Sequence, residues 1–306
     1  MADSDDLYDV LCYGTISLEN LTRLSHLPTP RRDAVAQLES DEVGGEALKV
    51  ALPLATWGLR VAVVGNYIGY DRKAAFILSE LARYPLVDAR YIRQHDNITT
   101  PFLRILVTPD GERSRIAYWY DDTPKDELTA ELMQRARLLS VDAYGRDERD
   151  RAAATAREYG KPVISADAIW LQYPLAGRSD AIIISRDWLQ ANFTGIYEYD
   201  HALELQAQGA GVIMITDGPR PVLVVRADGS AFGVEPYEIK HVVDTSGAGD
   251  LFKAGIIYGW LQPGWPLEHK VKFACAAAGL YVGRDRTSEP LPTLAEIQAL
   301  MRAQPR

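Results

Sequence analysis

The chain has 306 residues, of which 47% are hydrophobic and 25% charged, and a net charge of −9. This composition is ordinary for a globular protein, and without a basic stripe nucleic acid is not an expected partner. No apolar run approaches the ~20 residues of a membrane span, and the N-terminal residues lack an apolar signal core. We therefore expect a cytoplasmic protein that does not bind membranes and keeps Cys12 and Cys275 as buried free thiols.

Strand-like and helix-like segments alternate along most of the chain. In chain order we expect strand 7–14, helix 45–58, strand 59–65, helix 71–85, strand 136–143, helix 148–160 and strands 161–167, 180–185 and 211–218, with helical segments between the last three. Such alternation predicts an α/β fold with a mainly parallel sheet covered by helices on both faces. Length alone allows one domain or two, but no linker divides the chain.

Two segments depart from this alternation. Residues 18–43 contain no clean helix, and residues 99–120 have two strand-like runs around Pro109-Asp110-Gly111-Glu112, which predicts a β-hairpin. A hairpin that projects from a parallel core is a candidate lid, or else an ordinary extension of a sheet edge. The aromatic run 118–120 on its return strand is expected either to pack in a core or subunit contact or to form a stacking wall for a sugar or base.

The sequence DTSGAGD at 244–250 precedes an apolar helical run, and we expect strand, turn and helix over 239–261. Gly247 and Gly249 permit a tight turn and a close ligand approach, and the first N–H groups of the helix would bind an anion. The same field is expected to favour ionised Asp250. An anion hole beside a carboxylate suits phosphoryl transfer to a hydroxyl, although a capped helix start with an N-terminal acid explains the same residues.

Other phosphate-binding and metal-binding motifs are missing. The chain contains no GxxxxGK[ST], no GxGxxG after the first strand, no HExxH and no CxxC, and its five histidines are scattered. A P-loop and a histidine-based metal site are therefore not expected. The glycine turn is the one good candidate for a phosphate cradle.

The stretch DTSGAGDLFKAG resembles the C-terminal signature of the ribokinase-like, or PfkB, carbohydrate kinase family. The matching positions are Asp244, Thr245, Gly247, Ala248, Gly249, Asp250, Phe252 and Gly255. Further similarities extend over nearly the whole chain: Gly14 at the end of the first strand, the hinge pair Gly44-Gly45, the lid segments 99–101 and 110–113, the T-x-G turn 216–218 and the closing motif 291–293.

The resemblance implies a ribokinase-like three-layer sandwich with a small β lid. The lid would comprise about 15–43 and 93–120, and the core about 1–14, 44–92 and 121–306. It implies ATP and Mg²⁺ as cofactors, K⁺ in some members, and often a homodimer formed through the lid.

The family's site roles map onto matching positions of this chain. Asp250 would be the base that activates the acceptor hydroxyl, and the amides of Gly247, Ala248 and Gly249 would form the anion hole. Gly44 and Gly45 would let the backbone approach the substrate, and Thr216 and Gly218 would lie along ATP. Asp244 and the Ser246 carbonyl resemble ligands of a monovalent cation.

This chain departs from the family pattern at several positions. Glu19 and Lys49 stand where the family usually has Asp and Asn. Lys49 is expected to be a displaced surface lysine, a partner of Glu19 or a contact to an anionic or unusually hydroxylated substrate, and we favour the Glu19 pair. The NxxE motif is absent, with Ser185 and Asp187 in its place, so Asp187 is the candidate to assist Mg²⁺ through water. Near the C-terminus, the segment GRDRTSEP lacks the glycine of the family's usual Arg-x-Gly, which weakens the monovalent-cation interpretation.

These features predict an ATP-dependent kinase that phosphorylates a hydroxyl, expected to be primary, of a sugar or sugar-like small molecule. A nucleoside kinase on the same fold is the first alternative. A non-catalytic ligand-binding protein that kept the fold is the second.

Overall fold

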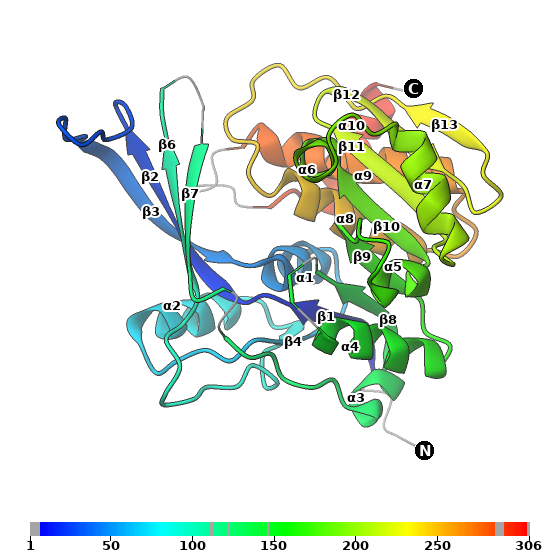
Figure 1. Cartoon of the computed structure of the whole chain (residues 1–306), viewed down its shortest axis with the longest axis horizontal. Coiled ribbons are helices and arrows are strands. Elements are labelled where there is room, and N and C mark those ends of the chain that lie inside the picture. The colour runs from blue at the N-terminus through cyan, green and yellow to red at the C-terminus, as the bar shows by residue number, and fades with distance from the viewer. Residues whose placement is uncertain are drawn as a thin grey trace.

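The structure is a computed structural model that describes residues 7–109, 113–120, 123–142, 144–145, 147–284 and 291–304. Its two sheets differ in size and position: a large twisted sheet with helices around it, and a smaller sheet that projects to one side (Figure 1).

The large sheet has nine strands among the described residues, in the order β13-β12-β11-β10-β9-β8-β1-β4-β5. The pairs from β10–β11 to β4–β5 are parallel, and β12 and β13 extend the edge in antiparallel fashion. Their bounds are β1 Tyr8–Gly14, β4 Val61–Gly65, β5 Val87–Asp88, β8 Ala136–Val141, β9 Val163–Ala166, β10 Ala181–Ser185, β11 Val212–Asp217, β12 Arg220–Val225 and β13 Ala231–Val234. The predicted mainly parallel sheet is confirmed.

Helices cover both faces of this sheet. One face carries α1 Glu46–Thr56, α2 Arg72–Leu81, α8 Ala248–Trp260, α9 Leu267–Val282 and α10 Leu294–Ala303, and the other carries α3 Ala130–Gln134, α4 Asp147–Glu158, α5 Pro174–Arg178, α6 Arg186–Asn192 and α7 Glu198–Ala207. Alternate residues of β1 enter different cores: Val10 and Cys12 face the first set of helices, and Leu11 and Tyr13 the second. This alternation follows from the two-residue period of a strand and gives a three-layer sandwich.

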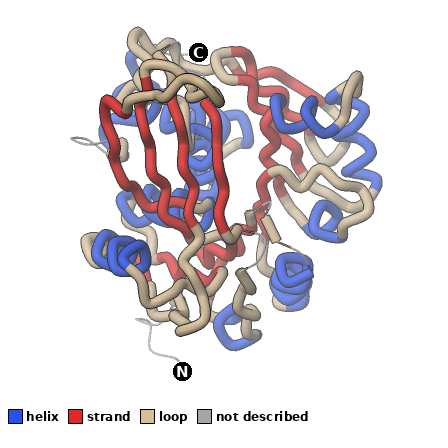
Figure 2. Tube along the Cα trace, turned by 60° about the vertical axis from the view of Figure 1, so that its left-hand side comes forward, coloured by secondary structure: helices blue, strands red, loops and turns tan. Residues whose placement is uncertain are grey.

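The smaller sheet is formed by the segments that we expect to act as a lid, and we call it the lid. It consists of β2 Ser17–Leu24, β3 Ala36–Gly44, β6 Phe102–Val107 and β7 Arg113–Tyr118, in the order β3-β2-β6-β7. Its strands lie together and apart from those of the large sheet (Figure 2). The predicted hairpin is confirmed as the antiparallel pair β6–β7, although its turn, 110–112, lies outside the described residues. Residues 18–43, which lack a helix pattern, supply the antiparallel pair β2–β3.

The strand that we expected just before the glycine turn is wrong. Residues 239–247 form no strand, and the backbone is anchored instead by N–H groups of Val243 and Asp244 that donate to the Val282 carbonyl at 2.8 and 3.2 Å. The apolar residues that suggested a buried strand are exposed, 58% for Val242 and 47% for Val243. A short apolar run did not guarantee burial here.

The cysteines and the helices also bear on the expectations from the sequence. Cys12 and Cys275 are buried free cysteines, as predicted. In the part of the chain that the structure describes, no helix combines the length and the apolar character that crossing a bilayer requires.

Candidate active site

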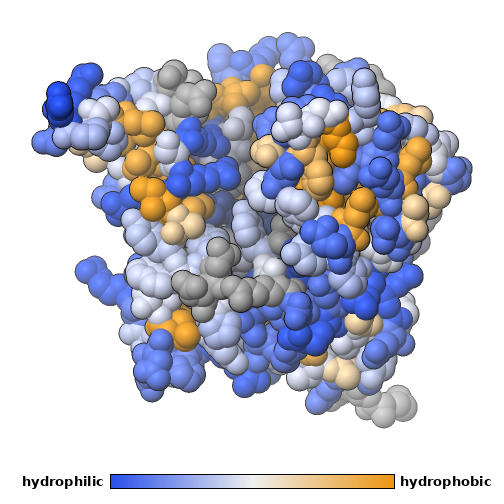
Figure 3. Space-filling view, viewed as in Figure 1, coloured by the Kyte–Doolittle hydropathy of each residue, from blue (hydrophilic) through white to orange (hydrophobic). Residues whose placement is uncertain are grey.

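A cavity of about 690 Å³ lies between the inner face of the lid and the carboxyl ends of the core strands. The molecule is hollowed between the two parts (Figure 3). Most of the predicted site residues line this cavity: Glu19, Gly45, Lys49, Asp187, Thr216, Gly218, Ser246, Gly247, Ala248, Gly249 and Asp250. Gly44 and Asp244 do not line it, but each contacts a residue that does.

The glycine turn forms the N-terminus of α8. Gly247 has a left-handed backbone (φ 73°), and the Leu251 N–H donates to its carbonyl at 3.0 Å. A Cβ atom added to Gly249 would meet nothing within 4 Å. A ligand can therefore approach the Gly249 backbone directly, at a helix end whose N–H groups and dipole favour anions.

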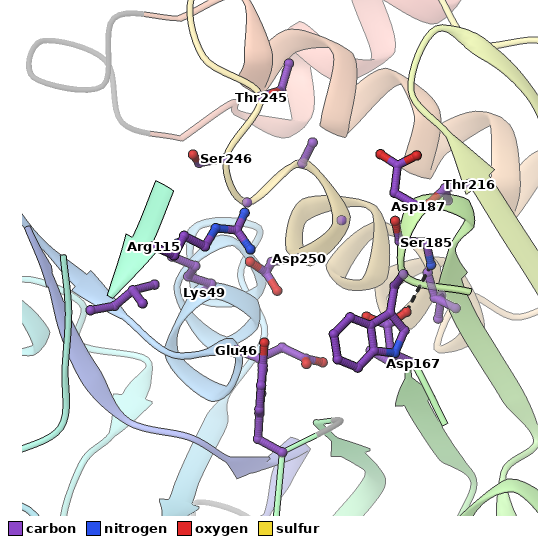
Figure 4. A pocket seen from close by; sticks show the side chains of 18 of the residues that line it. Glu46, Lys49, Arg115, Asp167, Ser185, Asp187, Thr216, Thr245, Ser246 and Asp250 are labelled. Carbon is purple, nitrogen blue, oxygen red and sulfur yellow. Dashed lines mark hydrogen bonds between the residues drawn. The ribbon is translucent and has the colours of Figure 1, made fainter. Parts of the chain in front are cut away.

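Asp250 lies in the first turn of α8, and its carboxylate points into the cavity (Figure 4). Burial raises the pKa of Asp250 to about 6, and the positive charges of Lys49 and Lys253 limit that rise. The helix field that we expected to favour the ionised form is thus opposed by desolvation, which acts in the other direction. With a pKa of about 6, the carboxylate still remains mainly ionised at neutral pH.

Glu19 and Lys49 form an ion pair across the hinge, with 2.5 Å between the Lys49 ammonium and the Glu19 carboxylate. Both side chains are largely buried, with exposed fractions of 12% for Lys49 and 10% for Glu19. Burial disfavours the charged form of Lys49, but the negative charges of Glu19 and Asp250 outweigh it and raise the pKa of the ammonium. Of the three interpretations of Lys49, the displaced surface lysine is excluded, and the pair with Glu19 is present.

The hinge glycines lie where the two lid connections meet. Gly45 has φ 81°, and an added Cβ would come within 2.1 Å of the Thr15 carbonyl oxygen. At Gly44 a Cβ would be 2.4 Å from the Cγ atom of Glu19. Glycine at both positions lets the strand entering the lid and the strand leaving it pass each other closely.

The expected nucleotide side is built by adjacent strand ends. Ser185 of β10 and Thr216 of β11 are register partners, and both line the cavity with Asp187 and Gly218. The left-handed Gly218 (φ 54°) has open space on its Cβ side. Ligand sites of parallel sheets lie outside the carboxyl ends of the strands, as here.

Asp244 lies immediately before the glycine turn and is engaged twice. Its carboxylate accepts a hydrogen bond from the Ser246 N–H at 2.9 Å and forms an ion pair with Arg113 of β7. This ion pair joins the lid to the glycine turn.

Several cavity residues were missed by the sequence analysis. Asp167 has φ 45°, accepts a hydrogen bond from the Ser185 N–H at 3.0 Å, and has a pKa raised to about 7 by burial. Glu46 accepts a hydrogen bond from the buried Lys253 ammonium at 2.5 Å. Asp167 is the last residue of the strand predicted over 161–167 and Glu46 follows the hinge glycines, so position relative to those features was the available signal. Arg115 and Tyr144 gave no such signal.

The aromatic run 118–120 divides between two environments. Tyr120 lines the cavity, and its hydroxyl lies 2.6 Å from that of Ser17. Tyr118 and Trp119 lie against each other outside the cavity, with ring centroids 5.6 Å apart and ring planes tilted by 39°, and both are more than one-third exposed. Of the three aromatic residues, only Tyr120 is placed where it could form a stacking wall for a ligand.

Among the described residues, no group of three or more His, Cys, Asp or Glu side chains could hold a metal ion. Asp167, Ser185 and Asp187 nevertheless place oxygen atoms along the nucleotide side of the cavity. This donor set suits an ion bound mainly by phosphate oxygens and water, which is the usual mode for Mg²⁺.

Comparison with curated proteins finds relatives that match most of this chain. The chain is 27% identical over 303 residues to "5-dehydro-2-deoxygluconokinase" of Bacillus subtilis (strain 168), covering 87% of this chain and 88% of that protein. Its identity to the protein of the same name from Listeria monocytogenes serotype 4a (strain HCC23) is 26% over 290 residues, covering 86% and 87%.

Solved structures share the fold. The ribokinase of Arabidopsis thaliana, complexed with ribose and ATP, superposes with a TM-score of 0.83 at 19% identity, covering 97% of this chain and 99% of that chain. A nucleoside kinase of Methanocaldococcus jannaschii gives 0.79 at 16% identity, covering 98% and 99%.

The family described as "pfkB family carbohydrate kinase" matches residues 9–294, from the first strand of the large sheet to the start of α10. Because this match spans most of the chain and includes the glycine turn, the chain belongs to the pfkB family of carbohydrate kinases.

Proposed function

We propose that this protein transfers the γ-phosphoryl group of ATP to a hydroxyl, expected to be primary, of a sugar-like small molecule. The observation that carries the proposal is the Asp250 carboxylate beside the open Gly247–Gly249 turn, inside a cavity that the lid covers. A base next to preorganised N–H groups is the arrangement that phosphoryl transfer to a hydroxyl requires.

In this mechanism Asp250 accepts the proton of the acceptor hydroxyl while the amides of Gly247, Ala248 and Gly249 stabilise negative charge on the phosphoryl group. Thr216 and Gly218 contact ATP. Gly44, Gly45, Glu19 and Lys49 hold the acceptor, with the Glu19–Lys49 pair offering both hydrogen-bond acceptors and donors. The lid excludes water, which would otherwise compete for the phosphoryl group.

ATP would bring Mg²⁺, which neutralises phosphate charge when bound, and Asp187 would hold it through water with Asp167 and Ser185 beside it. A monovalent cation such as K⁺ at Asp244 and the Ser246 carbonyl would compete with the Arg113 guanidinium for the same carboxylate. We therefore expect K⁺ to affect turnover only when Arg113 is moved or replaced.

The relatives' name identifies the first acceptor to test, 5-dehydro-2-deoxygluconate. A coupled assay of ADP release should compare sugars, sugar acids and nucleosides, each with the wild type and Asp250→Asn. Acceptor-dependent turnover with a sugar or sugar acid that disappears in Asp250→Asn supports the proposal. Turnover restricted to nucleosides would indicate the nucleoside kinase alternative, and binding of ATP without turnover of any acceptor would indicate the non-catalytic one.

We also propose a cytoplasmic homodimer formed through the lid. The two free thiols fit a reducing compartment. The lid exposes the apolar side chains of Ile116, Tyr118 and Trp119, each about 40% exposed, and an apolar group over β6 and β7 is visible in Figure 3. Exposed apolar patches of this kind mark interaction surfaces. Light scattering of the wild type and Ile116→Lys would test the dimer, and a monomeric wild type would contradict it.

A further inference from the structure

Arg115 is a cavity residue that the proposed mechanism leaves without a role. It lies on β7 opposite Ile105 of β6, and strand alternation places it on the same lid face as Glu19. It lines the cavity, and its guanidinium points inward on the side where Lys49 and Asp250 lie (Figure 4).

The other two cations that line the cavity are neutralised. Lys49 pairs with Glu19, and Arg113 pairs with Asp244. Across the described ranges, Arg115 makes no ion pair and no hydrogen bond, and it is exposed to solvent. Among the three cations that line the cavity, Arg115 is therefore the one without an acidic partner in the described structure, and it offers a planar, donor-rich group.

The hydroxyl groups of Thr15 and Tyr144 also belong to residues that line this cavity. Thr15 is only 2% exposed, its Oγ1 atom has no hydrogen-bond partner in the described structure, and its N–H is held by Asp142 at 2.5 Å. Tyr144 packs edge-on against Tyr120 with ring centroids 6.1 Å apart. Burial raises the pKa of Tyr144 to about 12 and the charge of Arg115 opposes that rise, so the guanidinium lies within electrostatic reach of the phenol.

A buried hydroxyl without a partner is costly unless a ligand satisfies it. Thr15, Tyr144 and Arg115 all line one cavity, and each carries a group that is able to donate a hydrogen bond. An uncharged sugar would satisfy the hydroxyls but leave the guanidinium without a counter-charge. A carboxylate satisfies both, because it accepts several hydrogen bonds and suits the planar guanidinium fork.

We propose that Arg115, Tyr144 and Thr15 form a carboxylate subsite and that the acceptor is a sugar acid. Arg115 pairs with the carboxylate, and the Tyr144 and Thr15 hydroxyls donate to it. The reacting hydroxyl at the other end of the molecule then reaches Asp250. The proposal rests on the proposed kinase function and names its substrate class. It also separates the two cations by role: Lys49 is neutralised by Glu19, and Arg115 supplies the charge that selects the acid.

The test compares acids with alcohols that differ only at C1: 5-dehydro-2-deoxygluconate with its C1 alcohol, and gluconate with glucitol. For Arg115→Gln we expect the KM of the acid to rise about tenfold or more, as loss of a charged hydrogen bond implies, and to rise much less for the alcohol. Arg115→Lys should recover part of the preference for the acid. Tyr144→Phe and Thr15→Val should raise the KM of the acid as Arg115→Gln does, but by smaller factors.

Arg104→Gln is the matched control, because Arg104 lies on the same lid sheet but on the opposite face, paired with Glu39 at 3.7 Å. It should leave the ratio of acid to alcohol unchanged. Equal loss for acid and alcohol in Arg115→Gln, with a parallel loss of ATP hydrolysis in the absence of acceptor, would place Arg115 on the phosphoryl group and overturn the subsite. A wild type that prefers the alcohol would overturn it as well, while leaving the kinase function intact.

Calorimetric titration of each acid into the protein with an unreactive ATP analogue tests the subsite without turnover. Acid binding that weakens in Arg115→Gln supports the subsite even if none of the four compounds is phosphorylated. Failure of the wild type to bind either acid overturns it. Failure of the proposed function is distinguishable, because it appears as absent turnover with the whole acceptor panel.

Discussion

The guanidinium of Arg113, on the return strand of the lid, forms an ion pair with the carboxylate of Asp244, the first residue of the glycine-rich turn. The two residues are 131 positions apart in the chain, and both side chains are largely buried, with exposed fractions of 18% and 10%. This contact joins the lid directly to the loop that would hold the transferred phosphate.

Arg113→Ala should therefore loosen the lid. We expect amide hydrogen exchange in β6 and β7 to accelerate at least about tenfold, which corresponds to ~1.4 kcal/mol in the opening equilibrium. Saturating ATP and acceptor should slow exchange over 99–120 in the wild type and less so in the variant. Arg104→Ala, on the outer face of the same sheet, is the control. Identical exchange in all three proteins would show that the ion pair does not hold the lid.

Replacing the proposed base gives the simplest test of chemistry. Asp250→Asn keeps the shape of the side chain but cannot accept the hydroxyl proton, and loss of a general base typically lowers kcat about 10²–10⁴-fold. ATP affinity, measured by titration, should change little because the proposed nucleotide contacts, at Thr216 and Gly218, lie elsewhere in the cavity. A variant that retained more than about a tenth of wild-type kcat would refute the assignment.

The pH profile should report the same carboxylate. With the pKa of Asp250 at about 6, kcat/KM should fall as the pH drops through 6, because protonation removes the base. The charge of Lys49 lowers this pKa and that of Glu19 raises it. Lys49→Met should therefore move the acid limb upward by about one pH unit and Glu19→Gln should move it downward. Shifts of the same sign in both variants would contradict the electrostatic account.

The hinge predicts a steric effect on stability. Gly45→Ala would place a Cβ 2.1 Å from the Thr15 carbonyl oxygen, so both strain and collision should destabilise the fold. Gly58→Ala is a matched control: Gly58 also has a positive φ, 87°, but its Cβ would meet nothing within 4 Å. We expect Gly45→Ala to lower the free energy of unfolding by at least about 1 kcal/mol more than Gly58→Ala does, measured by urea denaturation. Equal losses would mean that the hinge has room to adjust.

The features that the sequence predicted correctly are those determined by residues close together in the chain. The alternation of strands and helices depends on periodicity, and the glycine turn with Asp250 depends on a few consecutive residues, so both were accessible without coordinates. The Glu19–Lys49 pair could be proposed because each residue departs from a recognisable pattern.

Long-range packing accounts for the rest. In the sequence, Arg113 and Arg115 are two ordinary arginines of a hairpin. Their contacts with Asp244 and the cavity depend on how the lid is placed against the core. That the Thr15 hydroxyl is buried without a partner likewise depends on residues that are distant in the chain. The strand expected before the turn failed for a similar reason, because whether Val242 and Val243 are covered depends on elements far away in the chain.

The Glu19–Lys49 ion pair also restricts how such a site can change over generations. Each residue differs from the usual family residue, and each compensates the charge of the other inside a largely closed cavity. A lysine that arrived before its longer carboxylate would enter that cavity as a poorly paired cation, which is strongly destabilising. The carboxylate could lengthen first at little cost, since its charge does not change. The accessible route from the ordinary pocket to this one therefore runs through the change at position 19, and a laboratory reversal should restore position 49 before position 19.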